Sequence, residues 1–215
     1  MTALPSLLLI GGGRMGSAML AGWREQGLAR AFIVDPSEGA KALAGPEVTV
    51  LADAAQLPAD FAPEAVILAV KPQMAAAALP AYARFAETAL FISIMAGKTA
   101  QGVAALLGGA KAVVRAMPNT PAAVRQGITV AFPGAGVSLA QRNLATRLLE
   151  AVGQVAWVED EGALDAVTAI SGGGPAYVFL LTELLEQAGL DQGLPPDLAP
   201  VSYTHLRAHE TVLDL

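Results

Sequence analysis

The feature that most constrains the fold is a glycine pattern near the start of the chain, in the stretch LLLIGGGRMGSAML. Gly11, Gly13 and Gly16 have the spacing G-x-G-x-x-G, after a short apolar run and before a helical pattern from Met15 to Gln26. In this context the first glycine permits a tight turn, the second lets the backbone approach a pyrophosphate, and the third lets helix and strand pack closely. Glycines also serve ordinary turns, but the flanking strand and helix favour dinucleotide binding.

Short apolar runs alternate with helical stretches along the first two thirds of the chain. Runs that are apolar on both faces and are separated by helical lengths predict a parallel sheet covered on both sides. The sequence therefore predicts an α/β fold, with an N-terminal Rossmann-type doubly wound sheet over residues 1–159. Ser138 suits the N-cap of a helix reaching Val152. Strands are predicted at 7–10, 31–34, 65–70, 90–94, 112–115 and 128–132.

The pattern changes after Val158. Residues 160–169 and 177–187 are helical, with Gly189 and Gly193 as stops, which predicts the start of a second, all-helical domain over residues 160–200. The tail from 201 to 215, VSYTHLRAHETVLDL, does not match what precedes it and is interpreted as atypical, even foreign, sequence. It holds both histidines, His205 and His209. Without a third ligand nearby, we expect surface residues and no metal site.

Composition excludes several classes of protein. The net charge of -6 and the scattered basic residues argue against binding to nucleic acid or to an anionic membrane. The absence of cysteine excludes disulfides and thiolate zinc sites. Mean hydropathy is +0.51, yet the longest uncharged run, 166–182, is interrupted by three glycines and Pro175, so no membrane helix is expected. No signal peptide is recognised at the N-terminus, and a cytoplasmic location is expected.

Asp35 ends the second predicted strand. An acid there accepts hydrogen bonds from a ribose 2′-hydroxyl, which favours NAD, whereas a 2′-phosphate would be repelled. Asp35-Pro36-Ser37 is also good turn chemistry, and Arg14 or Lys41 is available to compensate a phosphate. The choice between NADPH and NADH therefore stays open.

Three further strand ends carry unusual residues: AVKPQ at 69–73, SIMAG at 93–97 and RAMPNTP at 115–121. In a doubly wound sheet, ligands bind outside the carboxyl ends of the strands. Lys71 alone is equally well explained as a solvated loop residue. Together the three ends predict a shared crevice for a nicotinamide and a substrate.

The stretches LAVKPQ, RAMPNTPAAVRQG and ISGGGPAYVF together resemble pyrroline-5-carboxylate reductase, the last enzyme of proline biosynthesis. The resemblance covers roughly residues 5 to 200, in the expected order, and a generic Rossmann protein would not carry both long motifs. It implies reduction of L-1-pyrroline-5-carboxylate, a cyclic imino acid, to L-proline by NADPH or NADH. It also implies interlocked homodimers and larger oligomers, in which helices of a second subunit complete the site.

The resemblance also assigns roles to residues. It matches Glu161 to an acid near the substrate amine, and 171–175 to a glycine-rich loop whose backbone amides hold the substrate carboxylate at a helix N-terminus. A helix start that merely packs closely against a partner is the alternative. The residues expected to orient the substrate are Glu161, Thr168, Ser171, Gly172, Gly173, Gly174 and Pro175. The residues expected to bind the cofactor are Gly11, Gly13, Arg14, Met15, Gly16, Asp35, Ala69, Val70, Lys71, Pro72, Met95, Ala96, Gly97, Met117, Pro118 and Asn119.

The sequence departs from the family pattern in two places. The family usually reads Ser-Gly-Ser-Gly-Pro, and Gly173 replaces the second serine. Losing a hydroxyl contact to a charged group costs about 1.5–3 kcal/mol, which weakens substrate binding without abolishing it. Thr168 is a candidate source of another hydroxyl. After GLPPDLA the atypical tail stands where the family has more helices, so dimer formation by this chain stays open.

The residue types present suit an imine better than a carbonyl. Hydride delivery to a carbonyl usually needs an acid, often His or Lys, yet no histidine precedes His205 and no lysine follows Lys111. An imine nitrogen enters already protonated, so the protein need only orient two rings and exclude water. The alternatives are a related Rossmann reductase of another imine or small acid, and an NAD(P)-binding protein without turnover.

Overall fold

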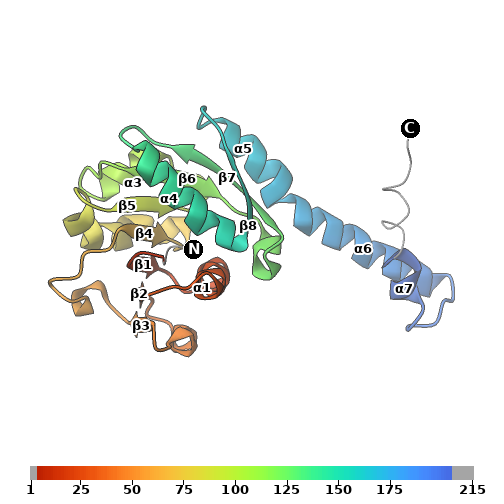
Figure 1. The fold of residues 1–215 in the computed structure, drawn as a ribbon. Coiled ribbons are helices and arrows are strands. Elements are labelled where there is room, and N and C mark those ends of the chain that lie inside the picture. Colours follow the sequence, from red (N-terminus) through yellow and green to blue (C-terminus); the bar gives the residue numbers. More distant parts are fainter. Residues whose placement is uncertain (1–3, 205–215) are drawn as a thin grey trace. The chain divides into compact units, whose positions relative to one another are not determined.

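The structure, a computed structural model, describes residues 4–204 and divides the chain into two compact units, Met1–Gly172 and Gly173–Leu215. An eight-stranded sheet forms the centre of the first unit, in the order β3-β2-β1-β4-β5-β6-β7-β8 (Figure 1). The strands are β1 (Leu7–Ile10), β2 (Ala31–Val34), β3 (Val48–Leu51), β4 (Ala65–Leu68), β5 (Leu90–Ser93), β6 (Val113–Met117), β7 (Gly127–Pro133) and β8 (Gly153–Trp157).

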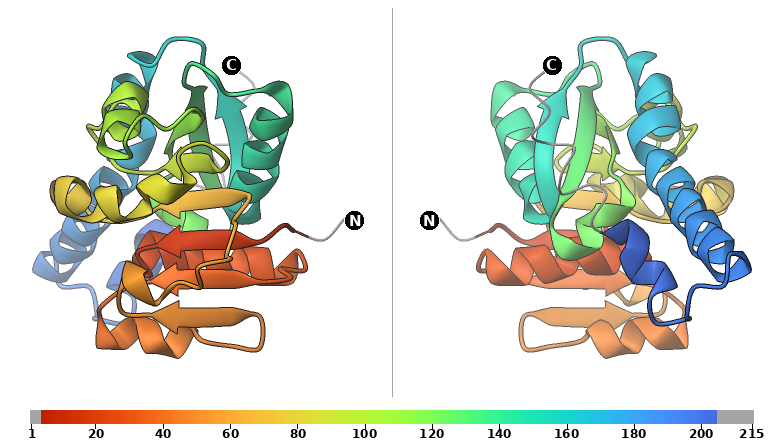
Figure 2. Two further views of the ribbon diagram at one scale, coloured as in Figure 1. Left: turned by 90° about the vertical axis from the view of Figure 1, so that its left-hand side faces the viewer. Right: turned by 90° about the vertical axis from the view of Figure 1, so that its right-hand side faces the viewer.

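Alternate residues of each central strand enter two separate apolar cores, one on each face of the sheet. In β1, Leu7 and Leu9 belong to the first core, whereas Leu8 and Ile10 belong to the second. Helices α1 (Arg14–Glu25) and α4 (Leu139–Leu149) cover the first core, and α3 (Ala100–Leu106) with the 3₁₀ segment η4 (Leu79–Phe85) covers the second. Figure 2 shows helical segments on both faces of the sheet. This burial on both sides explains why the strands are apolar throughout.

Short helical segments complete the connections. Ser138 caps α4 through a reciprocal pair of bonds with Gln141, which confirms the predicted N-cap. The other segments are η1 (Glu38–Leu43), η2 (Ala54–Gln56), η3 (Pro72–Met74), α2 (Ala75–Ala78), η5 (Thr120–Val124), η6 (Glu150–Val152), α5 (Ala163–Val167), η7 (Thr168–Gly172), α6 (Gly174–Asp191) and α7 (Ala199–Thr204).

The α/β fold and the six predicted strands are confirmed, with small shifts in their ends. The expectation that the later strands continue a parallel sheet is wrong for β7, which runs antiparallel to β6. Only a short connection containing η5 joins these strands, whereas parallel neighbours need a crossover of about a dozen residues or more. Strands β3 and β8 were not predicted. Both lie at an edge of the sheet, where one neighbour is missing and fewer positions are buried.

The helices described in the second unit, up to Thr204, are α6 and α7. Close packing joins the end of α6 to α7, because a side chain at Gly189 would meet Leu194 and Ala199. Gly193 follows the helix with φ of +88°, a conformation that suits a glycine stop. By length and composition alone, the helical run Ala163–Asp191 is long and apolar enough to cross a membrane. His205 and His209 lie outside the described residues.

The packing of α1 generates a prediction about stability. A methyl group at Gly22 would lie 2.1 Å from the Ala151 carbonyl oxygen, so Gly22→Ala must push α1 away from η6. We expect a loss of about 1–3 kcal/mol in the free energy of unfolding, measured by urea titration with tryptophan fluorescence. Gly39→Ala is the control, because nothing lies within 4 Å of the added methyl. Equal stability of the two variants would contradict this packing.

Candidate active site

The first glycine stretch lies where β1 and β4, neighbours in the sheet, both end. Gly11 has φ of +98°, and a methyl group there would lie 2.6 Å from the Ala69 carbonyl oxygen. A methyl group at Gly16 would lie 2.2 Å from the Gly11 carbonyl oxygen, so α1 packs directly on the turn. Gly13 differs, because it is the N-cap of α1 and nothing lies within 4 Å of an added methyl. The helix N-terminus therefore faces open space, as a pyrophosphate requires.

A cavity of about 430 Å³ opens beside this turn, at the carboxyl ends of β1, β2 and β4. This is the topological switch point of the sheet, where doubly wound proteins bind their ligands. Six predicted cofactor residues line it: Gly11, Gly13, Asp35, Ala69, Val70 and Lys71. The sequence reasoning missed the other lining residues: Ile10, Val34, Pro36, Ala52, Asp53, Ala54, Met74, Ala77, Ala78, Ala81 and Tyr82. The alanine run after KPQ was a usable signal, since small side chains leave room for a ring.

Asp35 is fixed at the end of β2 by two backbone donors. Its Oδ2 accepts from the Gly12 amide at 2.6 Å, and its Oδ1 accepts from the Ser37 amide at 2.8 Å. Partial burial alone would raise the pKa of Asp35, but the hydrogen bonds from Ser37 and Gly12 outweigh burial and hold the pKa below its usual value. The carboxylate is therefore charged at neutral pH.

The other predicted cofactor residues do not line this cavity. Met95 is buried in the second core, and Gly97 has φ of +67° in the turn after β5. Asn119 Oδ1 accepts from the Ile128 amide at 2.9 Å and so holds the turn between β6 and β7. The predicted residues outside the cavity lining are Arg14, Met15, Gly16, Pro72, Met95, Ala96, Gly97, Met117, Pro118 and Asn119.

The second glycine stretch starts beside the end of β6. A methyl group at Gly172 would lie 3.1 Å from Cε of Met117, which leaves no slack between η7 and this strand end. Met117 thus links two motifs that are far apart in the sequence. The first unit brings Gly172 to the strand end that was expected to lie beside the nicotinamide.

The expectation that 171–175 forms a loop is wrong. Residues Thr168–Gly172 form a π-helical turn, and Gly173 has helical dihedrals of -84° and -29° before α6 begins. Pro175 explains the irregular turn, because it has no N–H for the usual i−4 bond and its ring crowds that carbonyl. Glycines and a proline therefore change the pitch of a helix here without ending it.

The hydroxyls of this segment are engaged with the helix itself. Thr168 Oγ1 donates to the Leu164 carbonyl at 2.7 Å, and Ser171 Oγ donates to the Val167 carbonyl at 3.1 Å. Such bonds to the carbonyl four residues earlier are ordinary for Ser and Thr within helices.

Glu161 belongs to a polar cluster around Arg115. Its Oε1 accepts from the Ala100 amide at 2.7 Å and lies 3.5 Å from Arg115 Nη1, while Asp165 Oδ1 lies 3.3 Å from Arg115 Nη2. Arg115 is only 5% exposed, so these carboxylates compensate a buried charge. Glu161 also lines a second cavity, of about 530 Å³, which includes Phe132. The sequence reasoning missed this cluster, although an arginine inside an apolar strand was a signal.

Both glycine stretches lie within residues that match known protein families. Residues 161–206 match the family model for pyrroline-5-carboxylate reductase dimerisation, and residues 6–97 match the one for NADP oxidoreductase coenzyme F420-dependent. The chain is 40% identical over 200 residues to the pyrroline-5-carboxylate reductase of Pseudomonas aeruginosa, spanning 91% of this chain and 72% of that protein. The chain belongs to the pyrroline-5-carboxylate reductase family.

Solved structures of the family agree with this fold. The Coxiella burnetii pyrroline-5-carboxylate reductase superposes with a TM-score of 0.83 at 32% identity, covering 98% of this chain and 80% of that one. A Plasmodium falciparum pyrroline carboxylate reductase with NADP bound gives 0.84 at 25% identity, covering 98% and 79%. Within residues 4–204, no group of three or more His, Cys, Asp or Glu side chains is placed to hold a metal ion.

The two loop glycines should respond differently to the same substitution. Gly11→Ala forces a methyl group against the Ala69 carbonyl in a left-handed conformation, so we expect a loss of stability of about 1–3 kcal/mol. Gly13→Ala meets no protein atom, so we expect unchanged stability but at least roughly tenfold weaker dinucleotide binding by calorimetry. Undiminished dinucleotide affinity of Gly13→Ala would show that the open space at this N-cap is not the pyrophosphate site.

Proposed function

We propose that this chain reduces L-1-pyrroline-5-carboxylate to L-proline with NADPH or NADH, as a cytoplasmic step of proline biosynthesis. The observation that carries the proposal is the open helix N-terminus at Gly13, beside a cavity at the β1–β4 switch point, in a chain of this family. When bound, the nicotinamide cofactor supplies the hydride.

The residues around the cavity suit such a cofactor. The amides at the start of α1 face the pyrophosphate position, and Asp35 stands at the ribose position at the end of β2. Three segments lie at the carboxyl ends of β4, β5 and β6: Ala69 to Pro72, Met95 to Gly97 and Met117 to Asn119. We assign these three strand ends to the nicotinamide side of the same crevice.

A protonated cyclic imine fits the residue types at these strand ends. Both histidines of the chain lie at 205 and 209, and no lysine follows Lys111, so neither usual proton donor comes from the helices α4 to α7. An iminium needs no such donor, since its nitrogen already carries the proton and its carbon accepts hydride. The chain's task is then to orient the ring and exclude water.

We assign the substrate carboxylate to Ser171–Pro175. The π-helical turn and the missing N–H of Pro175 interrupt the regular i→i−4 ladder there, and the absence of a side chain at Gly172 lets its backbone lie close to the Met117 side chain. Glu161 and Thr168 are bonded inside the protein, to the Ala100 amide and the Leu164 carbonyl. We assign them to holding this segment in place, which orients the substrate indirectly.

Oxidation of NADH and NADPH by the purified chain tests the proposal. We expect oxidation that depends on pyrroline-5-carboxylate, with slower turnover of the six-membered piperideine carboxylates. Faster turnover of the larger ring would favour a related imine reductase. Cofactor binding without turnover of any imine would make the chain a dinucleotide-binding protein only.

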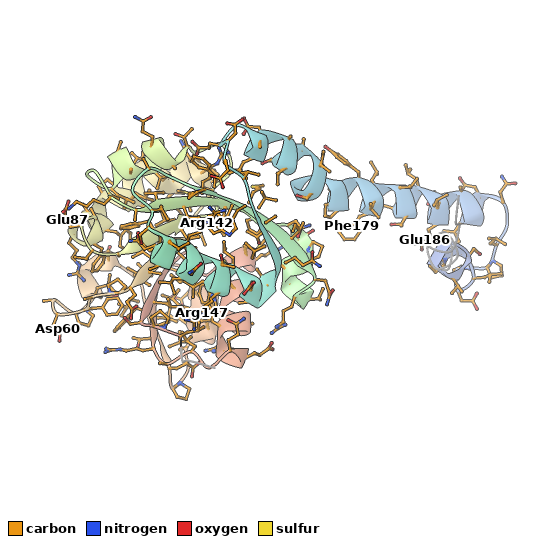
Figure 3. All side chains as sticks on the ribbon, turned by 45° about the horizontal axis from the view of Figure 1, so that its top comes forward. Asp60, Glu87, Arg142, Arg147, Phe179 and Glu186 are labelled. Atoms are coloured by element: carbon orange, nitrogen blue, oxygen red, sulfur yellow. The ribbon has the colours of Figure 1, made fainter. Side chains whose placement is uncertain are left out.

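We further propose that α6 packs against a second copy of this chain. Tyr177 is 67% exposed, Phe179 66% and Leu184 57%, and such an apolar surface is costly to leave in water. Phe179 is labelled on α6 in Figure 3. A membrane would also cover such a helix, but residues 161–206 match a dimerisation domain. We therefore assign a second copy of this chain, and not a membrane, as the partner that covers the apolar surface of α6.

Charge on this helix should separate the copies. Phe179→Asp combined with Leu184→Asp places two carboxylates in the apolar surface, and we expect the chain to sediment as a monomer in analytical ultracentrifugation. Glu183→Gln, on the same helix, is the matched control and should leave the oligomer intact. A wild-type chain that sediments as a monomer at micromolar concentration would overturn the second-copy assignment.

A further inference from the structure

We propose that this chain selects NADH over NADPH, and that Asp35, assisted by Asp53, is the determinant. The inference rests on the proposed function, because it needs a dinucleotide in the cavity beside Gly11. The matching family model and the Plasmodium falciparum structure both name NADP. The acids of this chain favour the other cofactor, NAD.

Asp35 is placed and oriented to accept hydrogen bonds from a ribose. It lines the cavity at the end of β2, and the Gly12 and Ser37 amides hold one carboxylate oxygen each. A carboxylate offers about four lone-pair sites, so the two backbone donors and the Ser37 side chain leave room for one further donor, the ribose 2′-hydroxyl. In doubly wound sheets this is the position where an acid bonds the ribose 2′-hydroxyl.

The same carboxylate would repel a 2′-phosphate. A phosphate monoester carries about −1.5 to −2 charge at neutral pH and would lie against a carboxylate that cannot turn away. Asp53, at the start of η2, lines the same cavity and adds a second negative charge. The cavity lining holds one cation, Lys71, which follows β4 and not β2.

The cations nearest in sequence to these acids do not offset them. Arg30 precedes β2, at the opposite end of the strand from Asp35, and its Cζ lies 4.9 Å from the centroid of the Phe32 ring. Lys41 Nζ is held by both carboxylate oxygens of Glu38, at 2.7 and 2.8 Å. Arg24 Nε donates to Glu47, and its Nη2 donates to the Leu43 carbonyl. Arg14, the first residue of α1, does not line the cavity. Phosphate recognition by a free arginine at the end of β2 is therefore not built into this part of the chain.

Calorimetric titration of the full chain with NAD⁺ and with NADP⁺ tests the inference without relying on turnover. We expect the wild type to bind NAD⁺ at least roughly tenfold more tightly than NADP⁺, which is the effect of one charge-assisted hydrogen bond. In Asp35→Asn and Asp35→Ser the ratio of the two dissociation constants should fall by about tenfold or more. Asp60→Asn is the control, because it removes the same charge from an acid outside the cavity lining, and its ratio should match the wild type.

The outcomes separate this inference from the proposed function. Equal or tighter binding of NADP⁺ by the wild type overturns the inference but leaves the reductase standing. If Arg14→Ala then abolishes NADP⁺ binding, the chain recognises the 2′-phosphate of NADP⁺ through Arg14. Asp35 would then not select the ribose 2′-hydroxyl of NAD⁺. Failure to bind either dinucleotide overturns the proposed function. The wild-type ratio decides the preference even if the Asp35 variants fold poorly.

Discussion

The close packing of α1 on the turn before it and on η6 is the contact on which the candidate site depends. Added methyl groups at Gly16 and Gly22 would lie 2.2 and 2.1 Å from the carbonyl oxygens of Gly11 and Ala151, so the helix packs backbone against backbone near both of its ends. This contact places the N-terminus of α1 beside the cavity at the carboxyl ends of β1 and β4. The open space at Gly13 exists because the glycines around it permit such close packing.

A buried charge ties the helical segment before α6 to the sheet. Arg115 extends from β6 between Glu161 and Asp165, and Glu161 also accepts from the first amide of α3. Removing either carboxylate would leave the buried Arg115 charge less compensated and would lower the stability of the fold. The cluster therefore fixes the orientation of the segment that carries Glu161 and Asp165. Through it, the residues leading to Gly172 are held against the strand end that carries Met117. One arginine thus joins β6 to the segment that leads into η7.

The two glycine stretches contain glycine for different physical reasons. Gly11 needs a left-handed conformation and a close carbonyl, and both demands exclude any other residue. Gly172 to Gly174 lie in a helical path, where glycine lowers stability by about 1 kcal/mol per residue relative to alanine. That cost, the π-helical turn and Pro175 occur together at the segment we assign to the substrate. A segment of this kind is built for backbone access more than for stability.

The sequence by itself determined the α/β class, the glycine turn between β1 and α1, the family and most of the central strands. These depend on local patterns: apolar runs buried on both faces, glycine spacing and specific motifs. It did not reveal β3 and β8, because edge strands lack that continuous burial. Tertiary structure alone decided the antiparallel β7, the helical form of 171–175, the Arg115 cluster and the meeting of Met117 with Gly172. Each of these depends on which distant segments touch, and no local periodicity encodes that.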